Sequence, residues 1–480
     1  MKKNIAIRCI VVWFCCLLLL TALTLPVLAN SAQTIWSGVT SSGVIVEDED
    51  CPLVVEKEIL TFDIPQFPSN YYQSVEEFTQ YSATVTAEYT FYNPSDYTVT
   101  ATLAFPFGNM PDYGVILDQE GETWAHETPE HTRQYGVQIN GELIDSVLRH
   151  TYAHPYDDFD LERDLLKLRD GFTEDPFFAP DMTVTIYTYE VSNLTEDEGY
   201  AAFHIAENED IRRIYPDEFN GFDRDGKQLS YGFWIKNGET ISLTVVGEPF
   251  FDEIPWTIYQ TGDEKTQIQG DIVLINTESV TFLEFALREY DQSSGILESD
   301  WYNAFVDELN KDPYRLEFGM RLSYSLMRWY EYEITLAPGE RIVNAVAAPI
   351  YPGINAGYEP PIYRYTYLLS PAQTWSEFGS LEIVINTTYH LISDNQQKLE
   401  KTETGYRVLL EGLPEGELTF ALSSEAKPKK ESPNISGYLS MTLILLLYLV
   451  IFSVPFVVVS LMLAWLVRTV IKYIKKKEKT

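Results

Sequence analysis

The sequence predicts a mainly β protein with two β-sandwich-like ectodomain units, a few short helices and one C-terminal transmembrane helix. Three observations support this prediction. Several segments alternate apolar and polar residues, which is typical of half-buried strands, and only two short segments show a helical period. One long run near the C-terminus has no charged residue at all.

The clearest strand signal spans residues 83–105. Ala83, Val85, Ala87, Tyr89 and Phe91 alternate with polar residues, and the same alternation resumes from Val99 to Phe105. Between them, Asn93-Pro94-Ser95-Asp96 has the composition of a turn. Because the period of two continues on both sides of a turn, this segment predicts an antiparallel hairpin with one face on a core.

Further strands divide the ectodomain into a large unit, 30–348, and a smaller one, 349–424. The large unit has strand patterns at 180–191, 231–246 and 330–348, with turn signals at Asn237-Gly238 and Pro338-Gly339. The smaller unit contains YRYTYLL, SLEIVINTTY, GYRVLL and GELTFALS. This spacing predicts an immunoglobulin-like or related sandwich close to the membrane. A polar linker, 425–436, follows it.

Two short helical patterns interrupt the large unit. Residues 160–168, DLERDLLKL, are amphipathic over two turns. Residues 299–311 place Trp301, Phe305 and Leu309 on one face behind a serine cap. Both segments are expected to be helical insertions in an otherwise β-rich domain.

The N-terminus has the features of a secretory signal peptide. Lys2, Lys3 and Arg8 precede an apolar run, and Val27-Leu28-Ala29 supplies the small residues of a cleavage site. We expect residues 1–29 to be removed. The apolar run is long, so an uncleaved membrane anchor remains the alternative.

The C-terminal apolar run predicts a single membrane span. Residues 437–467 carry no charge and exceed the roughly 20 residues that a membrane helix needs. The tail, 468–480, holds Arg468, five lysines and one glutamate. Because positive flanks stay in the cytoplasm, the ectodomain is expected outside the cell membrane, anchored in the lipid bilayer through 437–467.

Charge and cysteine content limit the partners and the chemistry. The formal net charge is −37, and residues 30–436 hold 25 basic against 70 acidic side chains. This acidity excludes nucleic acid as a general partner. Cys51 is the one cysteine outside the expected signal peptide, so an intrachain disulfide cannot form. A small buried residue is the favoured interpretation of Cys51, and an intermolecular link is the alternative.

Three segments together resemble known architectures: CPLVVEKEILTFDIPQFP, FYNPSDYTVTATLAFPFG and YRYTYLLSPAQTWSEFGSLEIVINTTY. They are similar to uncharacterised bacterial membrane-anchored surface proteins with β-sandwich domains of unknown function. Residues 81–141, which end near the Gln138-Ile139-Asn140-Gly141 strand, also resemble the vault/inter-alpha-trypsin domain. The resemblance implies a location and an architecture, and it brings no catalytic or cofactor-binding residues.

A histidine-rich stretch, HTYAHPYDDFD at 150–160, raises the question of a metal site. His150, His154 and Asp157 are its candidate ligands, because two histidines four apart on a helix can reach one zinc ion. Pro155 disfavours a helix at His154, and the aspartates suit the start of the next helix. A solvated loop is therefore the favoured interpretation. His126 and His131 form another pair at a different spacing.

Two further patterns have ordinary structural interpretations. In DEFNGFDRDG at 217–226, Asp223, Asp225 and Gly226 resemble part of a calcium loop, but the distal glutamate is missing. An Asp-Gly hairpin is favoured there, and only weak binding of divalent cations such as calcium is expected. The 9 tryptophans and 32 tyrosines could bind sugars beside carboxylates, although cross-strand pairing explains most of them.

The function predicted from these observations is that of a surface binding or interaction module, with an extracellular protein or glycan as partner. No nucleotide-binding, G-x-S-x-G, H-E-x-x-H or C-x-x-C motif is present. The alternative is an ectoenzyme, metal-assisted or carboxylate-based, acting on envelope glycan or peptide. The sequence names no catalytic residue for it.

Overall fold

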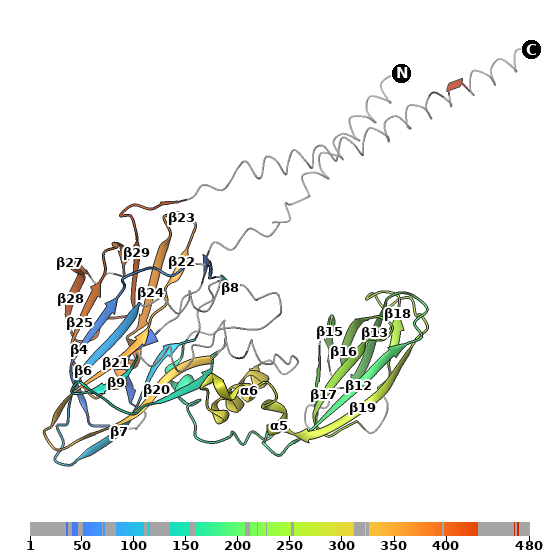
Figure 1. Ribbon diagram of the computed structural model, residues 1–480, viewed down its shortest axis with the longest axis horizontal. Coiled ribbons are helices and arrows are strands. Elements are labelled where there is room, and N and C mark those ends of the chain that lie inside the picture. Colours follow the sequence, from blue (N-terminus) through green and yellow to red (C-terminus); the bar gives the residue numbers. More distant parts are fainter. Residues whose placement is uncertain are drawn as a thin grey trace, which may run out of the picture. The chain divides into compact units, whose positions relative to one another are not determined.

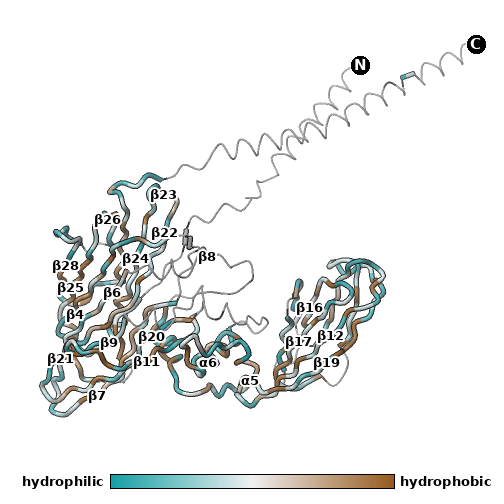
Figure 2. The backbone as a smooth tube through the Cα atoms, in the orientation of Figure 1, coloured by the Kyte–Doolittle hydropathy of each residue, from teal (hydrophilic) through white to brown (hydrophobic). Residues whose placement is uncertain are grey.

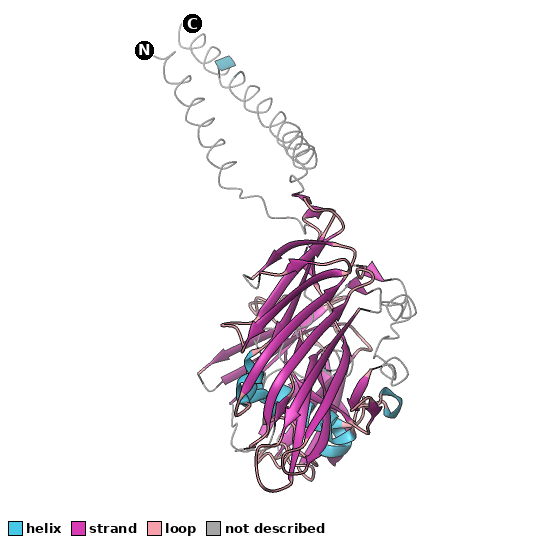
Figure 3. Cartoon of the chain, turned by 90° about the vertical axis from the view of Figure 1, so that its left-hand side faces the viewer, coloured by secondary structure: helices cyan, strands magenta, loops and turns pink. Residues whose placement is uncertain are grey.

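A computed structural model of the chain describes most of residues 35–430 and little of the two ends (Figure 1). The described residues are 35–36, 41–46, 51–69, 71–72, 83–109, 114–115, 135–153, 159–206, 212–217, 219–226, 228–250, 254–311, 322, 326–395, 398–430, 465 and 468–469. The expected signal peptide, 1–29, lies outside these residues. Strands predominate over helices throughout them (Figure 3), which confirms the mainly β fold class.

Three sheets enclose one core and form what we call the first sandwich. The eight-stranded sheet has the order β10 (Glu142–Leu143), β9 (Gly136–Ile139), β21 (Arg341–Pro349), β6 (Thr84–Tyr92), β4 (Val54–Asp63), β25 (Phe378–Asn386), β28 (Gly405–Glu411) and β27 (Glu400–Lys401). A four-stranded sheet has the order β11 (Val147–Tyr152), β20 (Leu326–Leu336), β7 (Val99–Gly108) and β3 (Ile45–Val46). The six-stranded sheet contains β1 (Ile35–Trp36), β22 (Gly353–Asn355), β24 (Ile362–Leu368), β29 (Leu418–Ser423) and β26 (His390–Asp394), with β2 (Ser41–Ser42) on β24.

The core of the first sandwich follows from the period-two pattern of its strands. Along β6 the buried and half-buried residues alternate strictly, so one face of the strand is apolar and points inward. The same alternation is visible as changes of hydropathy along the strands in Figure 2. Cys51 is half-buried and packs against this core.

The predicted hairpin at 83–105 is wrong in its pairing, although both strands and the turn are present. β6 pairs with β4 and β21, whereas β7 pairs with β20 and β3. The turn therefore carries the chain from one sheet to the other, and the apolar faces of β6 and β7 meet across the core. Alternation specifies which face is buried but not which strand is the neighbour.

A second turn of the same kind lies directly beside the first. β20 and β21 are joined through Pro338-Gly339 and also belong to different sheets. The buried Asn93 side chain connects the two turns: its Nδ2 donates to the carbonyl oxygens of Leu336 at 3.0 Å and Tyr97 at 2.8 Å. These hydrogen bonds provide donors for carbonyl groups at the turns, where the strand ladders end.

The structure differs from the expected separate sandwich at 349–424. β25 pairs in parallel with β4, from Phe378↔Val55 to Asn386↔Asp63, and β24 and β29 cover the same core. The C-terminal strands are thus integral to the first sandwich. Local sequence patterns cannot reveal this, because the paired strands are more than 300 residues apart in the chain.

Two four-stranded sheets form a second sandwich with its own core. One has the order β14 (Arg212–Pro216), β17 (Thr240–Gly247), β12 (Thr183–Ser192) and β19 (Asp271–Thr281). The other, which we call the glycine-containing sheet, has the order β15 (Gly221–Asp225), β16 (Gln228–Ile235), β13 (Gly199–Ala206) and β18 (Thr257–Tyr259). The whole unit lies in sequence between β11 and β20, which pair directly with one another.

Three described α-helices lie within the insertion between β11 and β20. α4 (Leu161–Leu165) begins at Asp160, whose side chain accepts from the Arg163 N–H. α5 (Phe282–Ala286) and α6 (Glu298–Lys311) share a core with Phe178 and Leu326. α4 and α6 lie where the sequence pattern predicts helices. The 3-10 helices η1 (Gln292–Ser294) and η2 (Ser370–Thr374) complete the helical elements.

A separate small unit contains β23 (Tyr358–Glu359) paired with β30 (Lys429–Lys430). The short parallel pair β5 (Tyr71–Tyr72) and β8 (Gly114–Val115) lies within the larger unit. Among the described residues, no helix has both the length and the apolar character needed to cross a membrane. The expected span, 437–467, lies outside the described residues except for Trp465, and so does the tail except for Arg468 and Thr469.

Candidate functional site

The outer face of the glycine-containing sheet gathers aromatic, glycine and polar side chains in three adjacent rows. Residues of β13 and β16 that point inward, such as Phe203 and Phe233, belong to the core of the second sandwich. The alternate residues therefore point outward. Strand register aligns them across the sheet as Trp234–Tyr200–Tyr259, then Gly221–Gly232–Ala202–Thr257, then Asp223–Ser230–His204.

The Tyr200 ring lies across the glycine row rather than standing away from the sheet. A Cβ atom added at Gly232 would collide with the ring, and one added at Gly221 would collide with its hydroxyl group. Both glycines are thus required for the ring to lie flat. The Trp234 indole meets Tyr200 edge-on, with ring centroids 5.2 Å apart, and is itself 44% exposed. Tyr200 itself is only 7% exposed, so the aromatic surface that solvent reaches is the Trp234 indole, which Tyr200 supports from below.

A chain of three polar side chains borders the glycine row on its other side. His204 Nδ1 lies 2.7 Å from Ser230 Oγ, and His204 Nε2 lies 3.2 Å from Glu264 Oε2. The contact with Glu264 is an ion pair whenever the imidazole is protonated. The carboxylate of Glu264 also faces Tyr200: burial and then this charge raise the pKa of the tyrosine hydroxyl.

The turn between β18 and β19 holds Glu264 over the sheet. Gln260 N–H donates to the Thr266 carbonyl oxygen at 2.8 Å, and Gly262 lies against the Tyr200 ring. Within the turn, Thr261 and Lys265 both contact Asp263, and their hydrogen bonds lower the pKa of that carboxyl to about 2. The turn is therefore a structured cover for one end of the face.

Glu264 itself adopts an unfavourable backbone conformation. Its φ of 55° lies in the left-handed region, which costs a residue with a side chain about 1 kcal/mol. Glycine or asparagine would fit there with less strain. In return, the glutamate places its carboxylate beside His204.

The order Ser230–His204–Glu264 resembles the side chains of a charge-relay system, but the strand that carries Ser230 offers no N–H donor for an oxyanion. An acyl transfer site needs N–H donors aimed at the developing oxyanion. Ser230 lies on a strand paired on both sides, to His204 on β13 and to Asp223 on β15. The N–H groups of this central strand belong to its two ladders and cannot serve as such donors.

Of the metal candidates predicted from the sequence, only His150 lies among the described residues. His150 lies on β11 and is buried, and its backbone N–H donates to Asp300 Oδ2 at 2.8 Å. The loop interpretation is therefore wrong for His150. His154, Asp157, His126 and His131 lie outside the described residues. No group of three or more potential metal ligands occurs within the ranges that the structure describes.

The Asp-Gly segment forms the turn that the sequence favoured. Asp225 pairs with Gln228 at the end of the β15–β16 hairpin, and Gly226 has a φ of 62°, which a tight turn requires. Asp223 and Asp225 are exposed on the outer face of the same sheet. Their oxygen atoms belong to the face described above rather than to a closed cation loop.

Sequence reasoning singled out Asp223 and Asp225 of this face but missed Tyr200, Trp234 and the row of Ser230, His204 and Glu264, although one signal was present. In YGFWIK, period two assigns Tyr231, Phe233 and Ile235 to the core, which leaves Trp234 on the polar side. An aromatic residue at an outward-facing position of a strand, where polar residues are usual, indicates a surface that contacts more than solvent. Glu264 had no comparable signal, because only the fold brings it to His204.

Comparisons with known proteins identify no family for the chain. No protein-family model matches the sequence, and no curated protein matches it. A crystal structure of "a putative nutrient binding protein" from Legionella pneumophila subsp. pneumophila str. Philadelphia 1 aligns with 81% of this chain and 72% of its own. The TM-score is 0.33 and the identity 10%, so we transfer neither a fold nor a ligand from it.

Proposed function

We propose that the chain is a membrane-anchored surface module that binds neutral saccharides through the outer face of the glycine-containing sheet. The observation that carries this proposal is the exposed Trp234 indole, held edge-on by the buried Tyr200 ring that lies over Gly221 and Gly232. A binding site for a small molecule combines such apolar rings with a few oriented polar groups. Sugars match this combination, because each ring has an apolar C–H face and a rim of hydroxyl groups.

The polar row supplies the hydrogen bonds that a saccharide needs. Asp223 and Glu264 can accept hydrogen bonds from hydroxyl groups, and Ser230 and His204 can both donate and accept them. The two carboxylates repel anionic sugars, which makes neutral oligosaccharides the expected ligands. This assignment deepens the sequence-based prediction of a surface binding module.

The membrane anchor rests on the sequence alone. Residues 437–467 are uncharged and the tail that follows is basic, which favours an ectodomain outside the membrane. Protease added to intact cells should therefore digest the ectodomain and leave the tail protected. Protection of the ectodomain instead would reverse the topology.

The test of binding uses the full-length chain in detergent solution and immobilised cello-, chito- and malto-oligosaccharides. Trp234→Ala and Glu264→Gln should each weaken retention of the chain by at least about tenfold, or roughly 1.4 kcal/mol. Tyr97→Ala is the matched control, because Tyr97 is exposed on a turn of the first sandwich. Failure of the wild-type chain to bind any of the three sugar series would overturn the proposal.

An ectoenzyme is the second candidate, and the contact between Ser230 and His204 is the observation in its favour. A nucleophilic serine would release product from an activated ester, and Ser230→Ala would abolish this turnover. We expect no turnover above that of the Ser230→Ala variant. Serine-dependent turnover would place a hydrolase at this face instead of a binding site.

A further inference from the structure

Among the described strands, one edge of β19 has no partner strand, and the saccharide site does not use it. β19 spans 11 residues and pairs with β12, and it is the last strand of its sheet among the described residues. An edge strand presents a row of backbone N–H and C=O groups that another strand can bind. The strand is seen at the margin of the second sandwich in Figure 1.

The side chains on this edge are apolar where an edge strand is normally protected by charge. Val273, Leu274 and Ile275 are 53%, 46% and 52% exposed. Residues 272–277 contain no charged residue and no proline, the two features that usually prevent strands from pairing at an edge. A contiguous exposed apolar surface of this kind marks an interaction site.

The shape of the edge selects an extended partner. The ladder to β12 is irregular between Thr188 and Tyr189, and Ile275 is the extra residue on β19 at that point. Such a bulge bends the strand and redirects a side chain outward without removing the backbone groups on either side. An extended peptide that adds a strand would use these groups for affinity and the apolar side chains for specificity.

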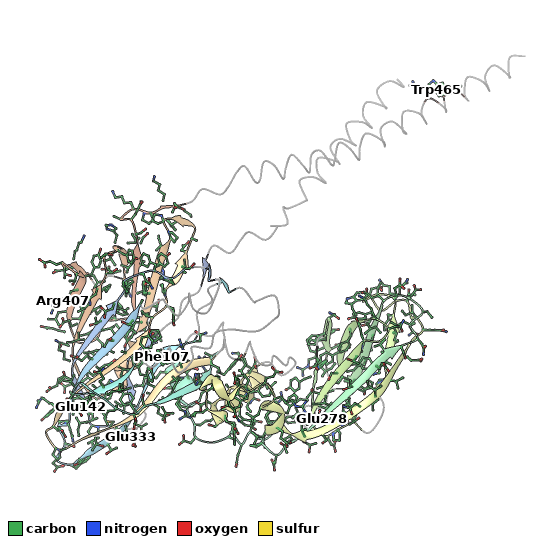
Figure 4. The ribbon with its side chains drawn as sticks, viewed as in Figure 1. Phe107, Glu142, Glu278, Glu333, Arg407 and Trp465 are labelled. Atoms are coloured by element: carbon green, nitrogen blue, oxygen red, sulfur yellow. The ribbon has the colours of Figure 1, made fainter. Side chains whose placement is uncertain are left out.

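The charges around the edge select a cationic partner. Asp271 and Glu278 lie at the two ends of the uncharged stretch, and Glu190 is paired opposite Val273 on β12. Arg288 already pairs with the Glu278 carboxylate at 2.8 Å (Figure 4 labels Glu278), so Asp271 and Glu190 supply most of the attraction for a cation. A second copy of this chain would bring like charges together, whereas lysine or arginine side chains flanking an apolar core would be attracted.

We propose that the β19 edge binds an extended cationic peptide segment by adding it as a further strand to the sheet. The partner has apolar residues on one face and lysine or arginine at its flanks. It lies alongside residues 272–278 and makes main-chain hydrogen bonds with β19. This surface is separate from the saccharide face, which lies on the opposite sheet of the second sandwich.

The test uses a fluorescent nine-residue peptide in which valine and threonine alternate between two terminal lysines, titrated with the full-length chain in detergent solution. Fluorescence anisotropy should report saturable binding. The double variant Val273→Lys/Ile275→Lys should raise the Kd at least about tenfold. Leu409→Lys is the matched control, because Leu409 is an equally exposed apolar residue on β28.

A second peptide separates strand addition from simple charge attraction. The same peptide, N-methylated at every second residue, keeps its charge but loses the N–H donors along one edge. Equal affinity for both peptides would overturn the proposal, and so would an unchanged Kd in the double variant. Sedimentation velocity of the chain alone completes the test: self-association that Ile275→Lys abolishes would make a second copy the occupant and contradict a cationic partner.

Discussion

Arg149 on β11 and Asp300 in the first turn of α6 form a buried ion pair that joins the first sandwich to the helical insertion. Arg149 Nε lies 3.2 Å from both carboxylate oxygens of Asp300, and both side chains are almost fully buried. Glu331 on the neighbouring strand β20 also contacts the guanidinium group, and Asp300 accepts a hydrogen bond from the His150 N–H. One carboxylate thus fixes a strand to a helix about 150 residues away in sequence.

Removal of one partner of this pair should strongly destabilise the fold. Asp300→Ala leaves the Arg149 charge buried with only part of its compensation, and we expect a loss of about 3–5 kcal/mol in the free energy of unfolding by urea. Arg288→Met is the control, because it breaks the exposed pair with Glu278 and should cost no more than about 0.5 kcal/mol. A loss below about 1 kcal/mol for Asp300→Ala would contradict this role for the pair.

Glu58 should make the stability of the first sandwich depend on pH. The side chain is fully buried, and burial raises the pKa of its carboxyl from 4.5 to about 7, while the nearby Tyr89 hydroxyl lowers it to a lesser extent. Among the described residues, no donor reaches either oxygen with full hydrogen-bond geometry. The folded state therefore binds a proton that the unfolded chain has already released between these two pH values.

The sign of the effect follows from this difference in proton binding. The folded state loses stability as the pH rises from about 4.5 to about 7, and the total loss is about 3 kcal/mol. Glu58→Gln cannot ionise, so its stability relative to the wild-type chain should increase by that amount between pH 4 and pH 8. Urea unfolding at both pH values measures it. A constant difference between the two chains would show that Glu58 does not titrate in this range.

Loss of the hydrogen-bond donor of the Asn93 side chain alone should destabilise the fold. Asn93→Asp retains an oxygen for the Ser95 N–H but loses the Nδ2 bonds to the carbonyl oxygens of Leu336 and Tyr97. Unsatisfied groups at a buried site cost about 1–3 kcal/mol each, so we expect at least about 2 kcal/mol of destabilisation at pH 7. Thermal unfolding against Ser95→Ala as the control measures this. Equal thermal unfolding midpoints for Asn93→Asp and the wild-type chain would contradict a stabilising role of Asn93 between the two turns.

Gly232→Ala should separate ligand binding from folding. The added methyl group would collide with the Tyr200 ring, which can tilt outward at a cost of about 1–2 kcal/mol in stability. The edge-on contact that positions the exposed Trp234 indole would then be lost, and saccharide binding should weaken at least about tenfold. Changed Trp234 fluorescence would report the displaced ring. Unaltered binding in a folded variant would mean that the Tyr200 ring is not part of the saccharide site.

The sequence revealed strands more readily than their partners. The alternation at 83–105 correctly assigned Val85, Tyr89 and Leu103 to one core, because the inward phase of a strand is a local property. The choice of a neighbouring strand is not local. β6 and β7 face each other across the core, and β4 pairs with β25, which follows more than 300 residues later in the chain. For the same reason the outward position of Trp234 could be predicted from the local alternation, whereas the contact between His204 and Glu264 could not.

The parallel pairing of β4 with β25 determines when the first sandwich can form during synthesis. The strands of the second sandwich all lie between Thr183 and Thr281, so that unit can assemble while the ribosome is still translating the rest. β4 can pair at once with β6, which follows it closely, but its other edge must wait for β25, and the long loop closure delays that pairing further. A nascent chain that stops before Phe378 leaves β4 as an open ten-residue edge beside a half-covered core. Premature termination should therefore yield aggregation-prone fragments from the first sandwich while the second folds normally.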